Sequence, residues 1–201
     1  MPIPLPLVDD EPPERADAAR NREALLAAAD ELIGECGVVS VTMDAVATRA
    51  GVGKGTVFRR FDSREGLMAA VLDRSERQFQ AAILSGPPPL GPGAEPMERL
   101  LALGHARIQL NLLHGALIVA AGRAGTRSYA AVSFTAMHMR YLLGELGVRG
   151  DIRFLATALL APLEVPILEQ QVEVEEMQLV HFVEAWDDLV RRVVTAGPPP
   201  R

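Results

Sequence analysis

Apolar residues recur three and four positions apart along most of the chain, which is the spacing of one buried face of an α-helix. The first such stripe covers about residues 21 to 36, and Gly37 follows where a left-handed helix cap is expected. Further helices are predicted at about 42–50, 54–61, 62–84, 97–113, 114–122, 127–146, 151–172 and 175–195. The sequence therefore predicts an all-α fold, in which Pro162 and Pro166 kink or split the helix at 151–172.

Proline and glycine divide the helices into groups. Residues 1–18 are Pro-rich and acidic without periodicity, and we expect a disordered tail. The stretch 86–96 (GPPPLGPGAEP) is the clearest break between groups, followed by the turns at 123–126 and 147–150. We therefore expect an N-terminal domain at 19–79, a larger helical domain at 80–196 and a short tail at 197–201.

The segment 42–61 has the pattern of a helix-turn-helix motif. Two short apolar stripes, each with residues four positions apart, lie on either side of Gly51, whose position requires a positive φ. Thr42 is the expected N-cap of the first short helix, and Asp62 with Glu65 has the spacing of a capping box for the helix after the motif. The second helix of such a motif enters the major groove of DNA.

Charge supports this interpretation only locally. The net charge of the chain is −6, but residues 49–64 contain five cations and a single anion, Asp62. Affinity for DNA depends on the contacting face, so an acidic protein with one basic face can bind it. Lys54, the only lysine in the chain, lies in this segment. The alternative is an ordinary solvated cationic helix face.

The run from Glu23 to Leu72 resembles the N-terminal domain of the tetracycline-repressor (TetR) family of bacterial transcription regulators. The matching pieces are ALLAAADELIGECG, VTMDAVATRAGVGKGTVFRRF and SREGLMAAVLD, which together cover roughly a quarter of the chain. The resemblance implies a three-helix DNA-binding domain followed by a helical ligand-binding and dimerisation domain. It also implies a homodimer whose ligand weakens binding to a palindromic operator.

The resemblance also implies which residues face DNA. They are Thr42, Gly53, Lys54, Thr56, Phe58, Arg59, Arg60 and Arg64. Two positions depart from the family pattern, because Phe58 replaces a phosphate-binding tyrosine and Gly53 replaces a serine that caps the recognition helix. Arg60 could restore the missing phosphate contact, and Arg64 lies near a basic position that contacts phosphate in the family.

Several polar or aromatic residues interrupt the apolar helices of the second domain. Because buried polar groups need partners, such residues can mark a ligand cavity. The candidate ligand-binding residues are His105, Gln109, Phe134, His138, Tyr141 and Glu164. Alternatively, each pairs locally or faces solvent; the family resemblance favours the cavity.

The last two predicted helices carry more apolar surface than one small domain easily covers. Two such helices from each of two subunits would form a four-helix bundle around a two-fold axis. The candidate interface residues are Leu155, Leu159, Leu163, Ile167, Val183, Trp186 and Val190. The alternative is packing within the core of a single subunit.

Other classes of function have little support. The four histidines lack the spacing of a metal site, and no serine or cysteine is paired with a base, so we expect no enzyme activity, metal or cofactor. The single cysteine, Cys36, falls in an apolar stripe and is expected to be buried. We expect no signal peptide and no membrane span, and hence a cytoplasmic protein.

We therefore expect a DNA-binding transcriptional regulator, in the form of a ligand-responsive homodimeric repressor. The partners would be double-stranded DNA and an apolar or amphipathic small molecule. An activator or dual regulator on the same scaffold is the alternative, as is a helical sensor or carrier with little DNA binding.

Overall fold

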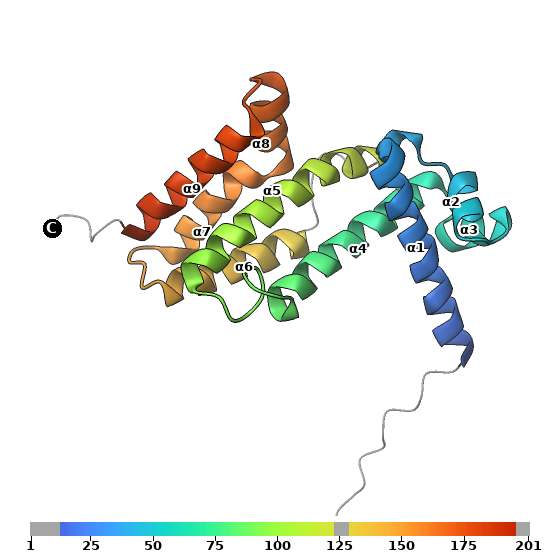
Figure 1. The fold of residues 1–201 in the computed structure, drawn as a ribbon, viewed down its shortest axis with the longest axis horizontal. Helices are drawn as coiled ribbons and strands as arrows, with labels where there is room; N and C mark the ends of the chain where they lie inside the picture. Colours follow the sequence, from blue (N-terminus) through green and yellow to red (C-terminus); the bar gives the residue numbers. More distant parts are fainter. Residues whose placement is uncertain (1–12, 123–128, 196–201) are drawn as a thin grey trace, which may run out of the picture. The chain divides into compact units, whose positions relative to one another are not determined.

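A computed structural model describes residues 13–122 and 129–195, and these residues form helices joined by turns and loops (Figure 1). The described part contains no β-strand, so the predicted all-α fold is confirmed. None of its helices is both long and apolar enough to cross a membrane. Parts of the predicted tails, 1–12 and 197–201, and the predicted turn at 123–126 lie outside the described residues.

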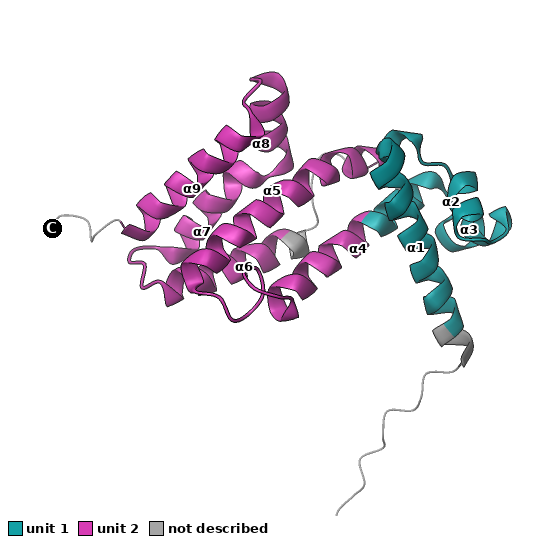
Figure 2. Ribbon diagram, in the orientation of Figure 1, with its two compact units in different colours: residues 1–71 teal, residues 72–201 magenta. Residues whose placement is uncertain are grey.

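The chain divides into two compact units, residues 1–71 and 72–201 (Figure 2). The division falls within helix α4 (Arg64–Ser85), between Val71 and Leu72, and not at the Pro/Gly loop that follows this helix. One continuous helix therefore contributes its first turns to the core of unit 1 and the rest to unit 2. The apolar stripe of α4 is buried at Leu67, Val71, Phe79 and Ile83.

Unit 1 contains α1 (Pro13–Ser40), α2 (Met43–Arg49), α3 (Lys54–Phe61) and the start of α4. Helix α1 begins before residue 21, so residues 13–18 belong to a helix and not to the predicted disordered tail. Proline at the first helical position suits this start, because a helix leaves that N–H without an internal partner. Gly37 interrupts the helical geometry at φ 76°, which confirms the predicted left-handed position.

Two details of unit 1 differ from the predictions. Helix α4 begins one residue later than a capping box at Asp62 requires, because the Oγ of Ser63 accepts a hydrogen bond from the Gly66 N–H at 3.1 Å. Asp62 instead ends α3 with φ 62°. Cys36 is exposed and not buried, and its thiol donates to the Leu32 carbonyl.

Unit 2 is built from the rest of α4 and from α5 to α9. Helix α5 (Pro96–Ala120) is continuous, so the predicted break at His114 is wrong. Helix α6 is Tyr129–Glu145, while the predicted start of this helix at Arg127 lies outside the described residues. Helix α5 packs against α6, α8 and α9.

The predicted helix at 151–172 is split. It consists of α7 (Ile152–Leu160), the 3-10 turn η1 (Ala161–Leu163), α8 (Val165–Glu169) and the π-helical turn η2 (Gln170–Val174). Both prolines stand at the first positions of a new turn, where a missing N–H is tolerated. The last helix, α9 (Leu179–Thr195), starts later than predicted, after Glu176 takes a φ of 56°.

Trp186 of α9 lies in the middle of the core of unit 2. Its Nε1–H donates to the Leu159 carbonyl at 2.9 Å, and its ring lies directly over Gly104 of α5. A Cβ at Gly104 would stand 1.9 Å from the ring, so a glycine is required for this close approach. Leu159, Leu163, Trp186 and Val190 are all buried within one subunit, which supports core packing over an intersubunit role at these four positions.

A charged pair also lies in this core, which sequence analysis did not identify. The guanidinium of Arg107 on α5 is fully buried and donates to both carboxylate oxygens of Glu76 on α4, at 2.7 and 3.1 Å. It also donates to Thr135 of α6 at 3.1 Å and lies 4.0 Å from the centre of the Phe79 ring. Buried charges persist when they are paired and hydrogen-bonded in this way.

Further polar groups surround this pair. The imidazole Nδ1 of His114 lies 3.3 Å from the Glu76 carboxylate, and its Nε2 lies 2.7 Å from the Ser75 hydroxyl. Burial alone would raise the pKa of Glu76, but hydrogen bonds from His114 and Arg107 outweigh it and lower this pKa from 4.5 to about 2. Asn111 connects Arg107 to the carbonyl of Leu163, the last residue of the 3-10 turn η1 in the split helix.

The lowered pKa of Glu76 predicts how stability depends on pH. Between pH 4.5 and about 2 the unfolded chain takes up a proton at this carboxyl that the folded chain does not, so the free energy of unfolding should decrease over this range. Glu76→Gln should remove that contribution and, by leaving Arg107 without its charged partner, lower the free energy of unfolding at neutral pH by about 3 kcal/mol.

Urea denaturation followed by circular dichroism at several pH values measures both effects. The exposed residue Glu98 on α5 provides the matched control, because Glu98→Gln should change neither quantity measurably. Equal stability of the Glu76→Gln variant and the natural chain would contradict the assigned role.

Candidate nucleic-acid interface and ligand pocket

Helices α2 and α3 of unit 1 have the local geometry of a helix-turn-helix. Their inward faces are buried at Val46, Ala47, Val57 and Phe61, and Gly51 in the connecting turn has φ 68°, as predicted. The turn is closed by a hydrogen bond from the Val52 N–H to the Ala47 carbonyl at 3.0 Å. The opposite face of α3 is therefore presented to solvent.

That outward face carries most of the residues predicted to contact DNA. Lys54, Phe58, Arg59 and Arg60 are exposed, and Thr56 is half-buried beside them. Arg59 donates to the Gly55 carbonyl one turn earlier in its own helix, at 3.3 Å. The two glycines near the start of α3, Gly53 and Gly55, leave open space where a Cβ would stand.

The starts of α2 and α3 are capped differently. The Oγ1 of Thr42 accepts the Ala45 N–H at 3.1 Å, which confirms the predicted N-cap. This bond uses an oxygen lone pair, so the hydroxyl hydrogen remains available to donate to another group. Gly53, the N-cap of α3, has no side chain with which to cap the helix, as the sequence predicted.

Arg64 has a structural role that the sequence did not indicate. Its guanidinium is part-buried and donates to the carbonyls of Val38 at 2.6 Å and of Val41 at 2.8 Å. These bonds tie the start of α4 to the end of α1 and to the segment that follows it. Arg60 likewise donates to the Ala18 carbonyl of α1, although its side chain is exposed. The phosphate contact expected of Arg64 stays a prediction beside this structural role.

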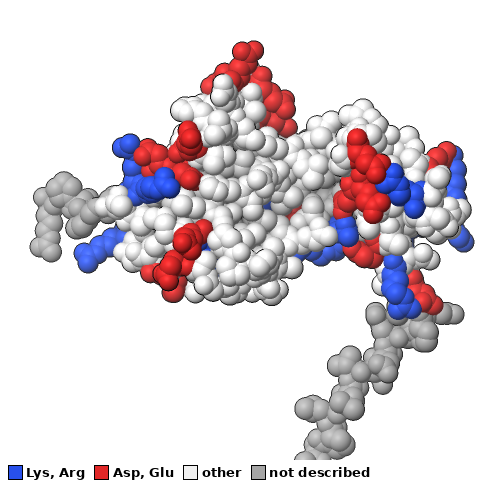
Figure 3. Space-filling view, viewed as in Figure 1, with Lys and Arg blue, Asp and Glu red and all other residues white. Residues whose placement is uncertain are grey.

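The basic charge of this face is smaller than the sequence window indicated. Lys54 forms an ion pair with Asp44 of α2 at 2.7 Å, and Arg49 pairs with Glu31 and Glu35 of α1 at 3.2 and 2.6 Å. Because the hydrogen bond from Arg49 stabilises the carboxylate, the pKa of Glu35 lies below its usual value. Figure 3 shows basic and acidic side chains next to each other over unit 1.

Four of the candidate ligand-binding residues have contacts with neighbouring side chains. On α6, the rings of Phe134 and His138 are stacked with centroids 6.5 Å apart, and the ring of Tyr141 follows at 5.8 Å. Burial, together with nearby Arg99, lowers the pKa of His138. On α5, the Nε2 of His105 lies 2.6 Å from the Asp187 carboxylate of α9.

The other two candidate residues lie on different elements. Gln109 is exposed on α5, and Glu164 lies between η1 and α8. Local pairing, which was the alternative to a shared cavity, thus describes His105 and His138.

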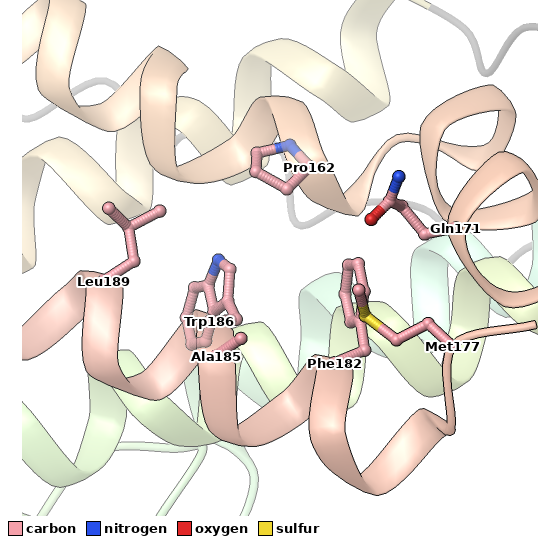
Figure 4. Close-up of a pocket in the computed structure, with 7 residues that line it drawn as sticks. All are labelled: Pro162, Gln171, Met177, Phe182, Ala185, Trp186 and Leu189. Carbon is pink, nitrogen blue, oxygen red and sulfur yellow. The ribbon is translucent and has the colours of Figure 1, made fainter. Parts of the chain in front are cut away.

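A partly open pocket of about 170 Å³ is formed by α9 and the split helix instead (Figure 4). Its lining contains none of the six predicted ligand residues. The lining residues are Pro162, Gln171, Met177, Phe182, Ala185, Trp186 and Leu189. The sequence contains a signal for this pocket. Two prolines interrupt one helix, and the helix that lies opposite carries two aromatic residues.

Comparison with known proteins connects unit 1 to a family. The model of the "Bacterial regulatory proteins, tetR family" matches residues 25–71, which include the whole helix-turn-helix. The transcriptional repressor BepR of Brucella suis is 33% identical over 81 residues, which is 38% of this chain and 39% of BepR. The chain thus aligns with about two fifths of the length of this relative.

Solved structures extend the similarity over the rest of the chain. A TetR-family transcriptional regulator from Pectobacterium atrosepticum is 22% identical, with a TM-score of 0.65 over 92% of this chain and 99% of that one, and shows the same fold. The multidrug binding protein EbrR, solved in complex with imidazole, is 25% identical with a TM-score of 0.58 over 98% of this chain and 100% of EbrR. Residues 25–71 therefore match the TetR family of bacterial regulatory proteins, and the chain as a whole has the fold of solved TetR-family regulators.

Proposed function

We propose that this protein is a transcriptional repressor that binds a palindromic operator as a homodimer and releases it when a small molecule binds unit 2. The observation that carries the proposal is the outward face of α3, which carries three exposed cationic side chains and a half-buried threonine, and whose start contains two glycines. Cations contact phosphate, while small residues allow close approach to base edges.

The side chains of this face fall into two groups by their position in the motif and by the part of DNA that each would contact. Lys54 and Thr56 lie in the first turn of α3, the part of a recognition helix that reaches base edges, and Arg59 lies in its last turn. Thr42 and Arg60 lie at the margins of the motif and suit phosphate contacts. The ring of Phe58 lies under the Lys54 ammonium at 5.7 Å, so it helps to position this cation.

The surface of unit 2 supports the proposed dimer. Several large apolar side chains on α7, α8 and α9 remain exposed in a single subunit: Phe154, Ile167 and Val180. Of the residues predicted for the interface, Ile167 is exposed, and Leu155 and Val183 are partly buried. A two-fold interface would cover this surface and place two recognition helices about 34–36 Å apart, one turn of DNA.

For a ligand to release the protein from its operator, the ligand needs only a different affinity for the DNA-binding and the DNA-incompetent states of the protein. A molecule that binds the DNA-incompetent state more tightly shifts the population towards it, typically by about 1–3 kcal/mol of coupling free energy. BepR is named as a repressor and EbrR as a multidrug binding protein, and both names agree with this combination of activities.

Arg59→Ala should weaken operator binding and reduce the dependence of log affinity on log salt concentration by about one unit, because one phosphate or base contact is lost. Fluorescence anisotropy with operator DNA at several salt concentrations measures both. Arg153→Ala, which removes an exposed arginine of α7, should leave them unchanged. An unchanged salt slope for Arg59→Ala would exclude this face from DNA contact.

Asp44→Asn should strengthen DNA binding, by about twofold to tenfold at low salt, because the carboxylate that pairs with Lys54 also repels phosphate. The gain should disappear in the double variant with Lys54→Ala if it operates through Lys54. Comparing the four affinities as a double-mutant cycle isolates this coupling. Weaker binding by Asp44→Asn alone would show that Asp44 instead holds Lys54 in its productive position.

The paired substitution Phe154→Asp and Val180→Asp should convert the dimer into monomers, because charge on this apolar surface opposes its burial. Sedimentation velocity at micromolar concentration measures the change. Val119→Asp on α5, at a similarly exposed valine, provides the control. A natural chain that sediments as a monomer would exclude the two-half-site geometry.

A further inference from the structure

The pocket between α9 and the split helix has a rigid aromatic floor. Trp186 is held from behind by its hydrogen bond to Leu159 and by its contact with Gly104, so its ring cannot turn away without disturbing α5. Phe182 stands one helical turn earlier on α9, and Figure 4 shows both rings bordering the same space. A ligand would therefore lose little free energy in ordering this surface.

The lining of the pocket determines the charge of what it can hold. Apart from Gln171, all the side chains that line it are apolar, and the lining contains no acid or base. An ionised ligand would lose hydration here without gaining a partner, which is strongly unfavourable. The pocket therefore selects an uncharged molecule.

Gln171 provides a single polar contact. Its Nε2 donates to the Glu175 carboxylate at 2.8 Å, which orients the amide. In Figure 4 the amide oxygen lies on the side towards the pocket and the nitrogen lies on the far side. The pocket thus offers one hydrogen-bond acceptor at the edge of an aromatic and aliphatic lining.

The volume limits the size of the ligand. A cavity of about 150 Å³ lined by apolar residues holds one benzene molecule in another protein, and this pocket measures about 170 Å³. One six-membered ring with a small substituent therefore fits, whereas larger fused-ring molecules would extend into solvent.

We propose that this pocket binds a small, uncharged, single-ring aromatic molecule with one hydrogen-bond donor, of which phenol is the simplest example. The ring would lie against Trp186 and Phe182, and its hydroxyl would donate to the Gln171 amide oxygen. Any effect of this ligand on operator release rests on the function proposed above, whereas its binding to the pocket does not.

Trp186 is the only tryptophan of the chain, so its fluorescence reports directly on the floor of the pocket. Titration of the full-length protein with phenol, excited at the red edge of tryptophan absorption, should give a saturable change with a Kd of roughly 0.1–1 mM, typical of a ligand of this size. Benzoate, of similar shape but charged, should give no saturable change. Calorimetric titration with phenol should return the same Kd.

Two variants test the position and the polar contact. Ala185→Phe places a ring in the mouth of the pocket from an exposed position and should abolish saturable binding. Glu184→Phe, at the preceding exposed position outside the lining, is the matched control and should bind as the natural chain does. Gln171→Leu should weaken phenol binding roughly twofold to tenfold but leave toluene binding unchanged, because only the hydrogen bond is lost.

Absence of a saturable signal with phenol in both fluorescence and calorimetry would overturn the proposal, as would equal binding by Ala185→Phe and the natural chain. A pocket filled by a second copy of the chain would also overturn it. This outcome would be recognised if the natural chain binds no phenol and Ala185→Phe loses the dimer. Operator affinity, measured separately, distinguishes these results from a failure of the DNA-binding proposal.

Discussion

The ion pair between Glu76 and Arg107 is the interaction on which the packing of unit 2 depends. Burying two charges costs several kcal/mol for each ion, and this cost is offset only while every hydrogen bond around the pair is made. The partners come from α4, α5 and α6, so these three helices must meet in one arrangement. Because α4 also begins in unit 1, the pair anchors the second half of a helix whose first half supports the helix-turn-helix.

Most of the helices could be predicted from apolar periodicity, because a buried stripe at helical spacing has one dominant explanation. Gly37, Thr42 and Gly51 were also predicted correctly, since their roles follow from local geometry. The predictions of helix bounds were wrong where contacts with distant parts of the chain determine whether a helix continues. His114 was read as a helix break, but it is held inside a continuous helix by Glu76 and Ser75, which lie far away in the sequence.

The candidate site residues also divide into those that follow from local sequence and those that depend on tertiary contacts. The outward face of α3 follows from the motif itself, so Lys54, Phe58 and Arg59 were placed correctly on the surface. The role of Arg64 could not be predicted, because the carbonyls that it binds become available only when the chain folds back between α1 and α2. Arg107 had a signal that was overlooked: it occupies a core position in the stripe that contains Leu100 and Leu103.

The carboxylates beside Lys54 and Arg49 also affect how the protein would search a chromosome. Non-specific attraction to DNA grows with the number of cations free to displace counterions, and Asp44, Glu31 and Glu35 reduce that number. A net charge of −6 reduces it further. Such a protein would spend little time on random sequence, so its discrimination would come from contacts that form only at a matching site, where the energy of those contacts compensates for breaking the internal pairs.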